Sequence, residues 1–183
     1  PCLQIEPASI CNYRCLFCYQ IDEEFTRKSN GMMGSMSLDL FKRVIDEAQG
    51  KCEAVTLASR GEPLICPDFG PMIKYAGGKF LALKLNTNAW FLNEKLCYAI
   101  LEAGVNTVVF SADAASEPTY SRLRVNGNLE KVYAIHRYHI LLQYACYRHQ
   151  KPVPGAWYQK FFFLYYIPLS GYQFQISSVW QNL

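Results

Sequence analysis

The sequence predicts an α/β fold in which short parallel strands alternate with helices. From about residue 3 to residue 145, short apolar runs alternate with amphipathic segments, which is the pattern of βα units. Val108 to Phe110 is apolar at consecutive positions, as in a strand that is buried on both faces. The helical segments open with capping residues and close with glycine.

The first half of the chain contains two of these units. Leu3 to Ile5 is expected to form the first strand, which leads into a cysteine-rich loop and a polar connection over residues 19–36. Ser37 is predicted to cap a helix that ends before Gly50. The apolar face of that helix comprises Leu38, Phe41, Val44, Ile45 and Ala48. Ala54 to Ala58 is expected to be the second strand.

Two further units follow. A short helix is predicted over Pro71 to Ala76, and a third strand then carries Leu81, Leu83 and Leu85 and ends at Asn86-Thr-Asn88. Asn93 is expected to cap the next helix, which closes at Gly104. Its apolar positions are Leu96, Ile100 and Leu101. Thr107 to Ser111 is predicted to be the fourth strand.

Two helices are expected after the fourth strand. Ser116-Glu-Pro118 has the residue types of a helix start, and Asn128 should start a longer helix. The apolar positions of the longer helix are Leu129, Val132, Ile135, His139 and Leu142. Because parallel strands place their ligand-binding loops at their carboxyl ends, the loops after the four strands should converge at one edge of the sheet.

The C-terminal region has a different composition. All fifteen acidic residues lie at or before Glu130, and residues 131–183 hold fourteen of the twenty-seven aromatic residues. Phe161 to Ile167 and Phe174 to Trp180 could each form a strand, or together a hairpin, but not two further βα units. We therefore expect a domain over residues 1–134 and an atypical tail over 135–183, either divergent or not native, in a chain that is a piece of a longer protein.

Composition narrows the class of protein. A net charge of +3, with no dense Lys/Arg cluster, does not favour a nucleic-acid partner. No apolar run reaches the roughly 20 residues of a membrane-spanning helix. Eight cysteines could indicate a secreted disulfide scaffold, but three of them are crowded into one short loop. This crowding favours a metal site in a reducing, cytoplasmic compartment.

Those three cysteines are Cys11, Cys15 and Cys18, in a C-x3-C-x2-C spacing. Three thiolates can hold a [4Fe–4S] cube by three corners and leave one iron open for another ligand. The alternative is a zinc site closed by a fourth cysteine, namely Cys2, Cys52 or Cys66.

The cysteine loop, with Phe17 directly before Cys18, resembles the signature C-x3-C-x-Φ-C of the radical S-adenosylmethionine (SAM) superfamily. Three later segments are similar to further motifs of this family in the same order, and the match covers about residues 3–135. They are Gly61-Glu62-Pro63, Thr87-Asn88-Ala89, and Ser111-Ala-Asp113 followed by Tyr120, Arg122, Arg124 and Gly127. Arg60, Ala89 and Ala114 stand where glycine is usual, which puts the geometry of these turns in question.

The resemblance implies a partial (β/α) barrel and a radical SAM enzyme. In this family a [4Fe–4S] cluster donates an electron to SAM, and the resulting 5′-deoxyadenosyl radical abstracts a hydrogen atom from the substrate. The resemblance implies that Cys11, Cys15 and Cys18 bind the cluster. The residues that it places near SAM are Phe17, Gly61, Glu62, Pro63, Asn88, Ser111, Asp113 and Arg124.

The motifs are typical of the branch of the family that matures peptides, proteins or cofactors, with a flavodoxin or ferredoxin as electron donor. The family's barrel normally has six βα units, so this chain is expected to be an incomplete core. Two other hypotheses stay open: a non-catalytic iron–sulfur or zinc protein, and an inactive fragment of a radical SAM enzyme. The sequence identifies neither the catalytic residues nor the substrate.

Overall fold

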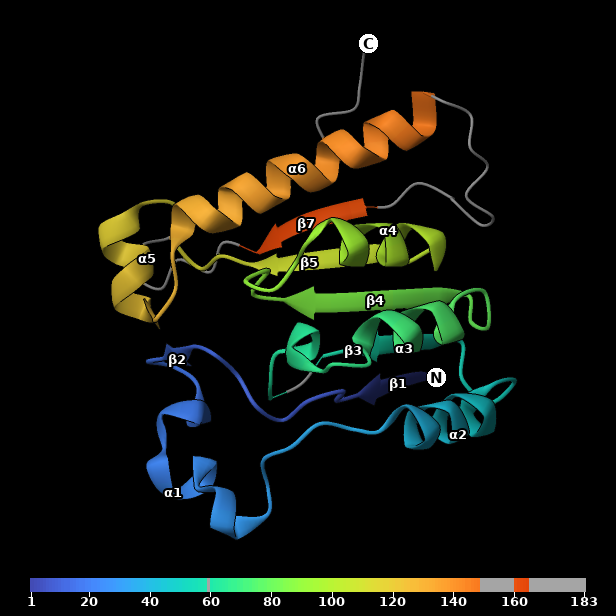
Figure 1. Cartoon of the computed structure of the whole chain (residues 1–183), viewed down its shortest axis with the longest axis horizontal. Coiled ribbons are helices and arrows are strands. Elements are labelled where there is room, and N and C mark those ends of the chain that lie inside the picture. The colour runs from blue at the N-terminus through green and yellow to red at the C-terminus, as the bar shows by residue number, and fades with distance from the viewer. Residues whose placement is uncertain (59, 149–159, 165–183) are drawn as a thin grey trace.

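The computed structural model describes residues 1–58, 60–148 and 160–164. Its main sheet has five parallel strands in the order β1-β3-β4-β5-β7. Their bounds are β1 Cys2–Ile5, β3 Ala54–Leu57, β4 Ala82–Thr87, β5 Thr107–Ser111 and β7 Lys160–Leu164. In Figure 1 the strands lie side by side in this order, and their arrowheads point toward the side where β2 and α5 lie.

Six helices and a two-stranded ribbon complete the described fold. The helices are α1 Glu23–Thr26, α2 Leu38–Ala48, α3 Phe69–Ala76, α4 Glu94–Glu102, α5 Glu117–Leu123 and α6 Leu129–Arg148. Strands β2, Arg14–Cys15, and β6, Arg124–Val125, pair antiparallel. Three short 3₁₀ segments span Tyr19–Ile21, Lys28–Asn30 and Pro63–Ile65. No helix in the described ranges is long and apolar enough to cross a bilayer.

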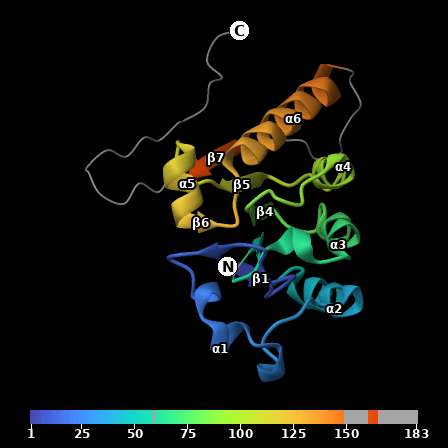
Figure 2. The ribbon, with the colours of Figure 1, turned by 60° about the vertical axis from the view of Figure 1, so that its left-hand side comes forward.

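The larger hydrophobic core lies between the sheet and helices α2, α3 and α4, which line one side of the sheet in Figure 2. Strand residues at alternate positions enter this core because successive side chains of a strand point to opposite faces. Leu83 and Leu85 of β4 are examples, as are Val55 and Leu57 of β3. The alternation predicted from the sequence is therefore the one that builds the core.

The predicted caps are present. The side chains of Ser37 and Asn93 accept hydrogen bonds from the backbone amides of Leu40 and Leu96 at the starts of α2 and α4. Gly50 and Gly104, which follow α2 and α4, have φ of 78° and 65°, the left-handed conformation that glycine adopts most readily.

One local prediction was wrong, and one connecting segment contains regular structure that was not predicted. Leu81 was placed in the third strand, but β4 begins at Ala82 and Leu81 is 83% exposed. Leu81 is spaced two residues from Leu83, as the strand pattern requires, but it lies outside both the strand and the core. Residues 19–36, predicted as a polar connection, contain α1, and the Asp22 carboxylate accepts hydrogen bonds from the amides of Glu24 and Phe25 at its start.

Strand β7 continues the parallel sheet beyond the four predicted units. It pairs with β5, so that Val109 stands opposite Phe162, and the long helix α6 lies between the two strands in sequence. The predicted strand over 161–167 is thus confirmed up to Leu164, whereas residues 174–180 lie outside the described residues. Helix α6 itself runs across residue 134, and the division of the chain at that residue stays a prediction.

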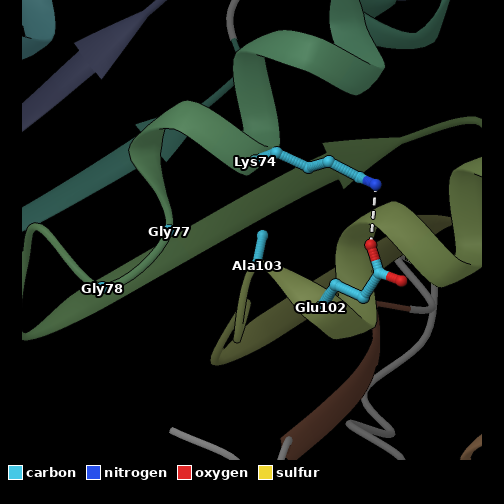
Figure 3. A pocket seen from close by; sticks show the side chains of 5 residues that line it. All are labelled: Lys74, Gly77, Gly78, Glu102 and Ala103. Atoms are coloured by element: carbon cyan, nitrogen blue, oxygen red, sulfur yellow. Dashed lines mark ion pairs between the residues drawn. The ribbon is translucent and has the colours of Figure 1, made fainter. Parts of the chain in front are cut away.

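One hollow of about 320 Å³ lies where α3 and α4 end, at the amino edge of the strands. Lys74 and Glu102 form an ion pair of 2.7 Å across it, and Gly77, Gly78 and Ala103 complete its lining (Figure 3). The cysteine loop follows the carboxyl end of β1, at the other edge of the sheet. This hollow therefore belongs to helix packing and not to the predicted site.

Candidate functional site

The cysteine loop is fastened to the rest of the protein on two sides. On one side β2 pairs with β6, so that the backbone of Cys15 lies opposite Arg124, and the Leu16 amide donates to the Leu123 carbonyl. On the other side the Glu62 amide donates to the carbonyl of Ile10, directly before Cys11. The loop is thus held by the segment after β3, which was predicted to converge with it, and also by the segment after α5.

The three thiols share one environment. Cys15 is 7% exposed and belongs to a second hydrophobic cluster, against which the half-buried Cys11 and Cys18 pack. Tyr13, Ala114, Tyr120, Leu129 and Val132 are the other buried members of this cluster. A cluster of metal and sulfur held here would be screened from water by apolar side chains.

Burial dominates the proton affinity of two of these thiols, Cys11 and Cys15. It raises the pKa of Cys11, and the nearby Glu62 carboxylate and Cys18 thiol raise it further, against the effect of the Tyr13 amide. Burial likewise raises the pKa of Cys15 to about 11, opposed by the positive charge of Arg124. Cys11 and Cys15 therefore favour their protonated forms until a cation binds, because a metal displaces the proton from its thiol ligand.

Cys11 receives two N–H groups. The Tyr13 amide lies 3.4 Å from its sulfur, and the side-chain nitrogen of Asn88 lies at 3.8 Å. Asn88 is itself fixed, because its nitrogen also donates to Asn12 and its oxygen accepts from the Trp90 amide. Asn88, predicted from the Thr-Asn motif, thus reaches the first cysteine.

Glu62 joins two of the predicted motifs. Its side chain is 2% exposed, and its carboxylate accepts from the Thr87 hydroxyl at 2.6 Å, the Asn88 amide at 2.7 Å and the Leu64 amide at 3.1 Å. Burial raises the pKa of Glu62, and these three hydrogen bonds oppose that rise. The buried Glu62 side chain therefore links the loops after β3 and β4, and both of its carboxylate oxygens accept hydrogen bonds within the protein.

Gly61 lies directly against the segment that precedes the cysteines. A Cβ atom at this position would stand 2.0 Å from the carbonyl oxygen of Ala8 and 2.7 Å from that of Ile10. The two backbones approach this closely only because Gly61 has no side chain. Pro63 is buried at the first position of the following 3₁₀ segment, where its missing amide hydrogen costs nothing.

Arg124 and Asp113 form an ion pair at the end of β5, in which the guanidinium donates through two nitrogens to one carboxylate oxygen. The guanidinium also lies 5.7 Å from the centre of the Phe17 ring, which is 61% exposed. Burial raises the pKa of Asp113, and Arg124 opposes that rise. This arrangement brings together three predicted residues, Phe17, Asp113 and Arg124, beside Cys15.

Ser111 is the predicted residue for which the structure shows no fixed role. It lies half-buried at the carboxyl end of β5, and no side-chain hydrogen bond to it is found among the described residues. Its position at this edge of the sheet agrees with the sequence-based expectation, and its contact with SAM stays a prediction.

Four neighbours of the site were not among the predicted residues. Tyr13 and Tyr120 are buried with their hydroxyls 3.5 Å apart, and Tyr13 meets the Trp90 ring edge-on. Thr87 donates to Glu62. Thr87 and Tyr120 already stood within the matched motifs, so their position beside the predicted residues was a usable signal. No comparable signal marked Tyr13 or Trp90.

The predicted zinc alternatives lack a fourth thiol at the loop. Cys66 is buried in the larger core and contacts the Met36 carbonyl and the Met72 sulfur, while Cys2 starts β1 at the amino edge. Cys52 lines a cavity of about 570 Å³ that also includes Pro1 and Gly78. In the described ranges no three or more Cys, His, Asp or Glu side chains are grouped to hold a metal ion.

The donor set of the loop nevertheless fits an iron–sulfur cluster. A single zinc ion, with zinc–sulfur bonds of about 2.3 Å, needs its thiolates tightly gathered, whereas the corners of a [4Fe–4S] cube accept thiolates that are farther apart. Here three half-buried or buried thiols within one loop lie near enough to affect one another electrostatically, without being grouped around a single ion.

Comparison with known proteins settles the family. The sequence model of the Radical SAM superfamily matches residues 5–140, which include all four motifs. The chain belongs to the radical SAM superfamily. Enzymes of this family use a [4Fe–4S] cluster and SAM, as the sequence-based resemblance implied.

Two curated relatives match about two thirds of the chain. The AdoMet-dependent heme synthase of Methanosarcina barkeri (strain Fusaro / DSM 804) is 28% identical over 125 residues, which are 68% of this chain and 34% of that protein. A probable GTP 3′,8-cyclase of Methanococcus maripaludis (strain C5 / ATCC BAA-1333) is 27% identical over 123 residues, 67% of this chain and 39% of that protein. The matched region thus spans little more than a third of these radical SAM relatives.

Solved structures show the same fold. SuiB of Streptococcus suis bound to its precursor peptide SuiA aligns with a TM-score of 0.63 at 16% identity, over 75% of this chain and 30% of that one. BtrN in complex with AdoMet and 2-DOIA aligns with a TM-score of 0.52 at 20% identity, over 63% of this chain and 46% of that one. At these identities the likeness establishes the partial barrel of the radical SAM fold.

Proposed function

We propose that this chain is the cluster- and SAM-binding part of a radical SAM enzyme. The observation that carries the proposal is the position of the three thiols. They lie on one loop at the carboxyl edge of the sheet, clamped between Glu62 on one side and Arg124 on the other. The alternative of a non-catalytic zinc protein has no comparable support, because a structural zinc site requires a fourth ligand.

Cys11, Cys15 and Cys18 would hold the [4Fe–4S] cluster, with one iron left for SAM. When bound, the cluster and SAM supply one-electron chemistry that splits SAM and removes a hydrogen atom from the substrate. The residues of this chain position both cofactors and exclude water. The apolar cluster around Tyr13 and Tyr120 performs the exclusion.

The structure refines the roles proposed for the residues near SAM. Because the Glu62 carboxylate already accepts three hydrogen bonds, we propose that the Gly61–Pro63 segment meets SAM through its backbone. Because Arg124 is paired with Asp113, it would orient Phe17 and the cysteine loop, and the partly exposed Ser111 hydroxyl is the better donor to SAM.

The substrate proposal follows the motifs and the relatives. Maturation of a peptide, a protein or a cofactor is favoured, since the relatives include a heme synthase and the solved structures include SuiB with a precursor peptide. A flavodoxin or ferredoxin would supply the electron, in the cytoplasm.

Anaerobic iron–sulfur reconstitution, followed by measurement of 5′-deoxyadenosine formed from SAM and dithionite, tests the proposal. The wild-type chain should take up close to one cluster and form 5′-deoxyadenosine. Cys15→Ala should lose the full cluster, while Cys52→Ala, a cysteine outside the loop, should retain it. Binding of zinc in place of iron without SAM affinity, or a full cluster in Cys15→Ala, would contradict the proposal.

A further inference from the structure

The main sheet has a second face, opposite helices α2, α3 and α4, that carries a row of polar side chains. Residues on this face alternate with those of the larger core along each strand. Gln4, Thr56, Lys84 and Thr107 stand next to one another in the register of four neighbouring strands. The row therefore crosses the sheet from β1 to β5.

Among the second-face positions of β1, β3, β4 and β5, Lys84 is the charged residue. Lys160 of β7 stands next to Thr107 in register and extends the row by one position. The second-face positions of β1, β3, β4 and β5 hold no acidic residue, and within the described residues Lys84 forms no ion pair. Its neighbours in register, Thr56 and Thr107, carry hydroxyl groups. Lys84 is half-buried, and a lysine without a carboxylate partner among the described residues attracts an anion.

Asn86 is two residues farther along β4 on the same face, at a Cα separation of about 7 Å. Its side-chain oxygen is buried and has no hydrogen-bond partner within the described part of the chain. A buried acceptor in this state costs free energy, which a ligand with an N–H or O–H group recovers. Asn88, the next alternate position, contacts the Cys11 sulfur. The polar row along β4 thus leads toward the cysteine loop.

We propose that Lys84 and Asn86 form an oxoanion-binding subsite for the substrate of the enzyme. Lys84, assisted by the hydroxyls beside it, would bind a carboxylate or phosphate group, and Asn86 would accept a hydrogen bond from a donor adjacent to that group. An acidic group next to an N–H is the chemistry of an N-acylated amino acid or a peptide terminus. This inference rests on the proposed function only in calling the ligand a substrate.

Protection of Lys84 from an amine-reactive acetylating reagent, read by mass spectrometry, tests the subsite on the full chain. The probes are acetate, inorganic phosphate and N-acetylglycine, which carries an N–H beside its carboxylate. Lys95, exposed on α4, is the internal control. We expect the anions to slow acetylation at Lys84 and not at Lys95, and the stronger of acetate and phosphate identifies the kind of oxoanion. If the anions slow acetylation of Lys84 no more than they slow acetylation of Lys95, the proposal is overturned.

The role of Asn86 has its own readout. N-acetylglycine should protect Lys84 at a concentration about tenfold below that needed for acetate, since it satisfies the buried oxygen. Asn86→Leu should remove this advantage, and Asn86→Asp, of nearly the same shape, should abolish protection by any anion because it neutralises Lys84. An advantage that persists in Asn86→Leu would exclude Asn86 from the subsite.

The acetylation experiment can be interpreted independently of the test of the proposed function. Acetylation is measured with Cys15→Ala as well as with the wild-type chain, so no cluster is required. If Lys84 is protected but no 5′-deoxyadenosine forms, the subsite is supported and the proposed radical SAM activity is contradicted. If 5′-deoxyadenosine forms but Lys84 is not protected, the activity is supported and the subsite is contradicted.

Discussion

At the scale of single residues, the site depends on side chains that connect loops. Glu62 is the clearest case, because one buried carboxylate collects donors from the segment after β3 and from the end of β4. Its neighbour Gly61 allows the backbone on which the cysteine loop rests to come close. Both residues lie in one motif, and both help to fix the position of the cysteine loop.

Gly61→Ala should destabilise the protein by about 3 kcal/mol, because its Cβ would overlap the backbone oxygen of Ala8 and force the two segments apart. Gly70→Ala is the matched control. Its Cβ would stand 3.7 Å from Leu96 in ordinary contact, and alanine in helix α3 should be neutral or stabilising by up to about 1 kcal/mol. Urea unfolding of both variants measures the difference, and equal midpoints would contradict this account of Gly61.

The turn after β4 holds an alanine in the left-handed conformation, at a position where glycine is usual. Ala89 has φ of 66°, whereas Ala114, the other such replacement, is not in the left-handed region. Both residues are buried, so each loses the same methyl contacts when changed to glycine. Ala89→Gly should therefore be less destabilising than Ala114→Gly by about 1–2 kcal/mol, which is the cost of the left-handed conformation for a residue with Cβ.

Thermal or urea unfolding of these two variants gives the comparison directly. If Ala114→Gly costs no more than Ala89→Gly, backbone strain at Ala89 is not what separates the two turns.

At the scale of elements, β1, β3, β4, β5 and the helices between them were predictable because each shows a local signal. Alternation marks the strands, and Ser37, Asn93 and Asn128 mark helix starts. The four motifs also identified the loops that meet at the cysteines. The Arg124–Asp113 pair and the contacts of Tyr13 could not be predicted in the same way, since they depend on how β6 docks on β2, which no local pattern encodes.

Helix α6 carries a titratable group inside the fold. Burial lowers the pKa of His136 to about 4, and its ring meets Phe110 edge-on. Since an unfolded histidine titrates near 6.5, the contribution of His136 is fully present above that pH. It should be lost as the pH falls toward 4, because the unfolded chain then binds a proton that the folded chain does not.

The wild-type protein should therefore lose more stability between pH 7 and pH 5 than His136→Gln does. Urea unfolding at the two pH values measures the difference, in which other titrating groups cancel. Parallel losses in both proteins would mean that His136 is protonated in the folded state as readily as in the unfolded chain.

At the scale of the whole molecule, two hydrophobic clusters stabilise different parts of the structure. The larger one joins the sheet to α2, α3 and α4, and the smaller one surrounds the cysteine loop with residues of α5 and α6. The smaller cluster contains few buried residues, and the loop it supports has little regular structure. Segments of this kind open with a lower free energy than the global unfolding of the protein.

Val55 and Val132 allow this division to be tested, since both are fully buried valines, one in each cluster. Val55→Ala should lower the global free energy of unfolding by about 2 kcal/mol and leave the relative protection of the cysteine loop unchanged. Val132→Ala should reduce hydrogen-exchange protection mainly over the cysteine loop and α5, and it should weaken cluster uptake, with a smaller effect on global unfolding. Hydrogen exchange by mass spectrometry, together with urea unfolding, reads both quantities. If the two variants lose protection uniformly along the chain, the clusters form one cooperative unit, and the site cannot open while the sheet stays folded.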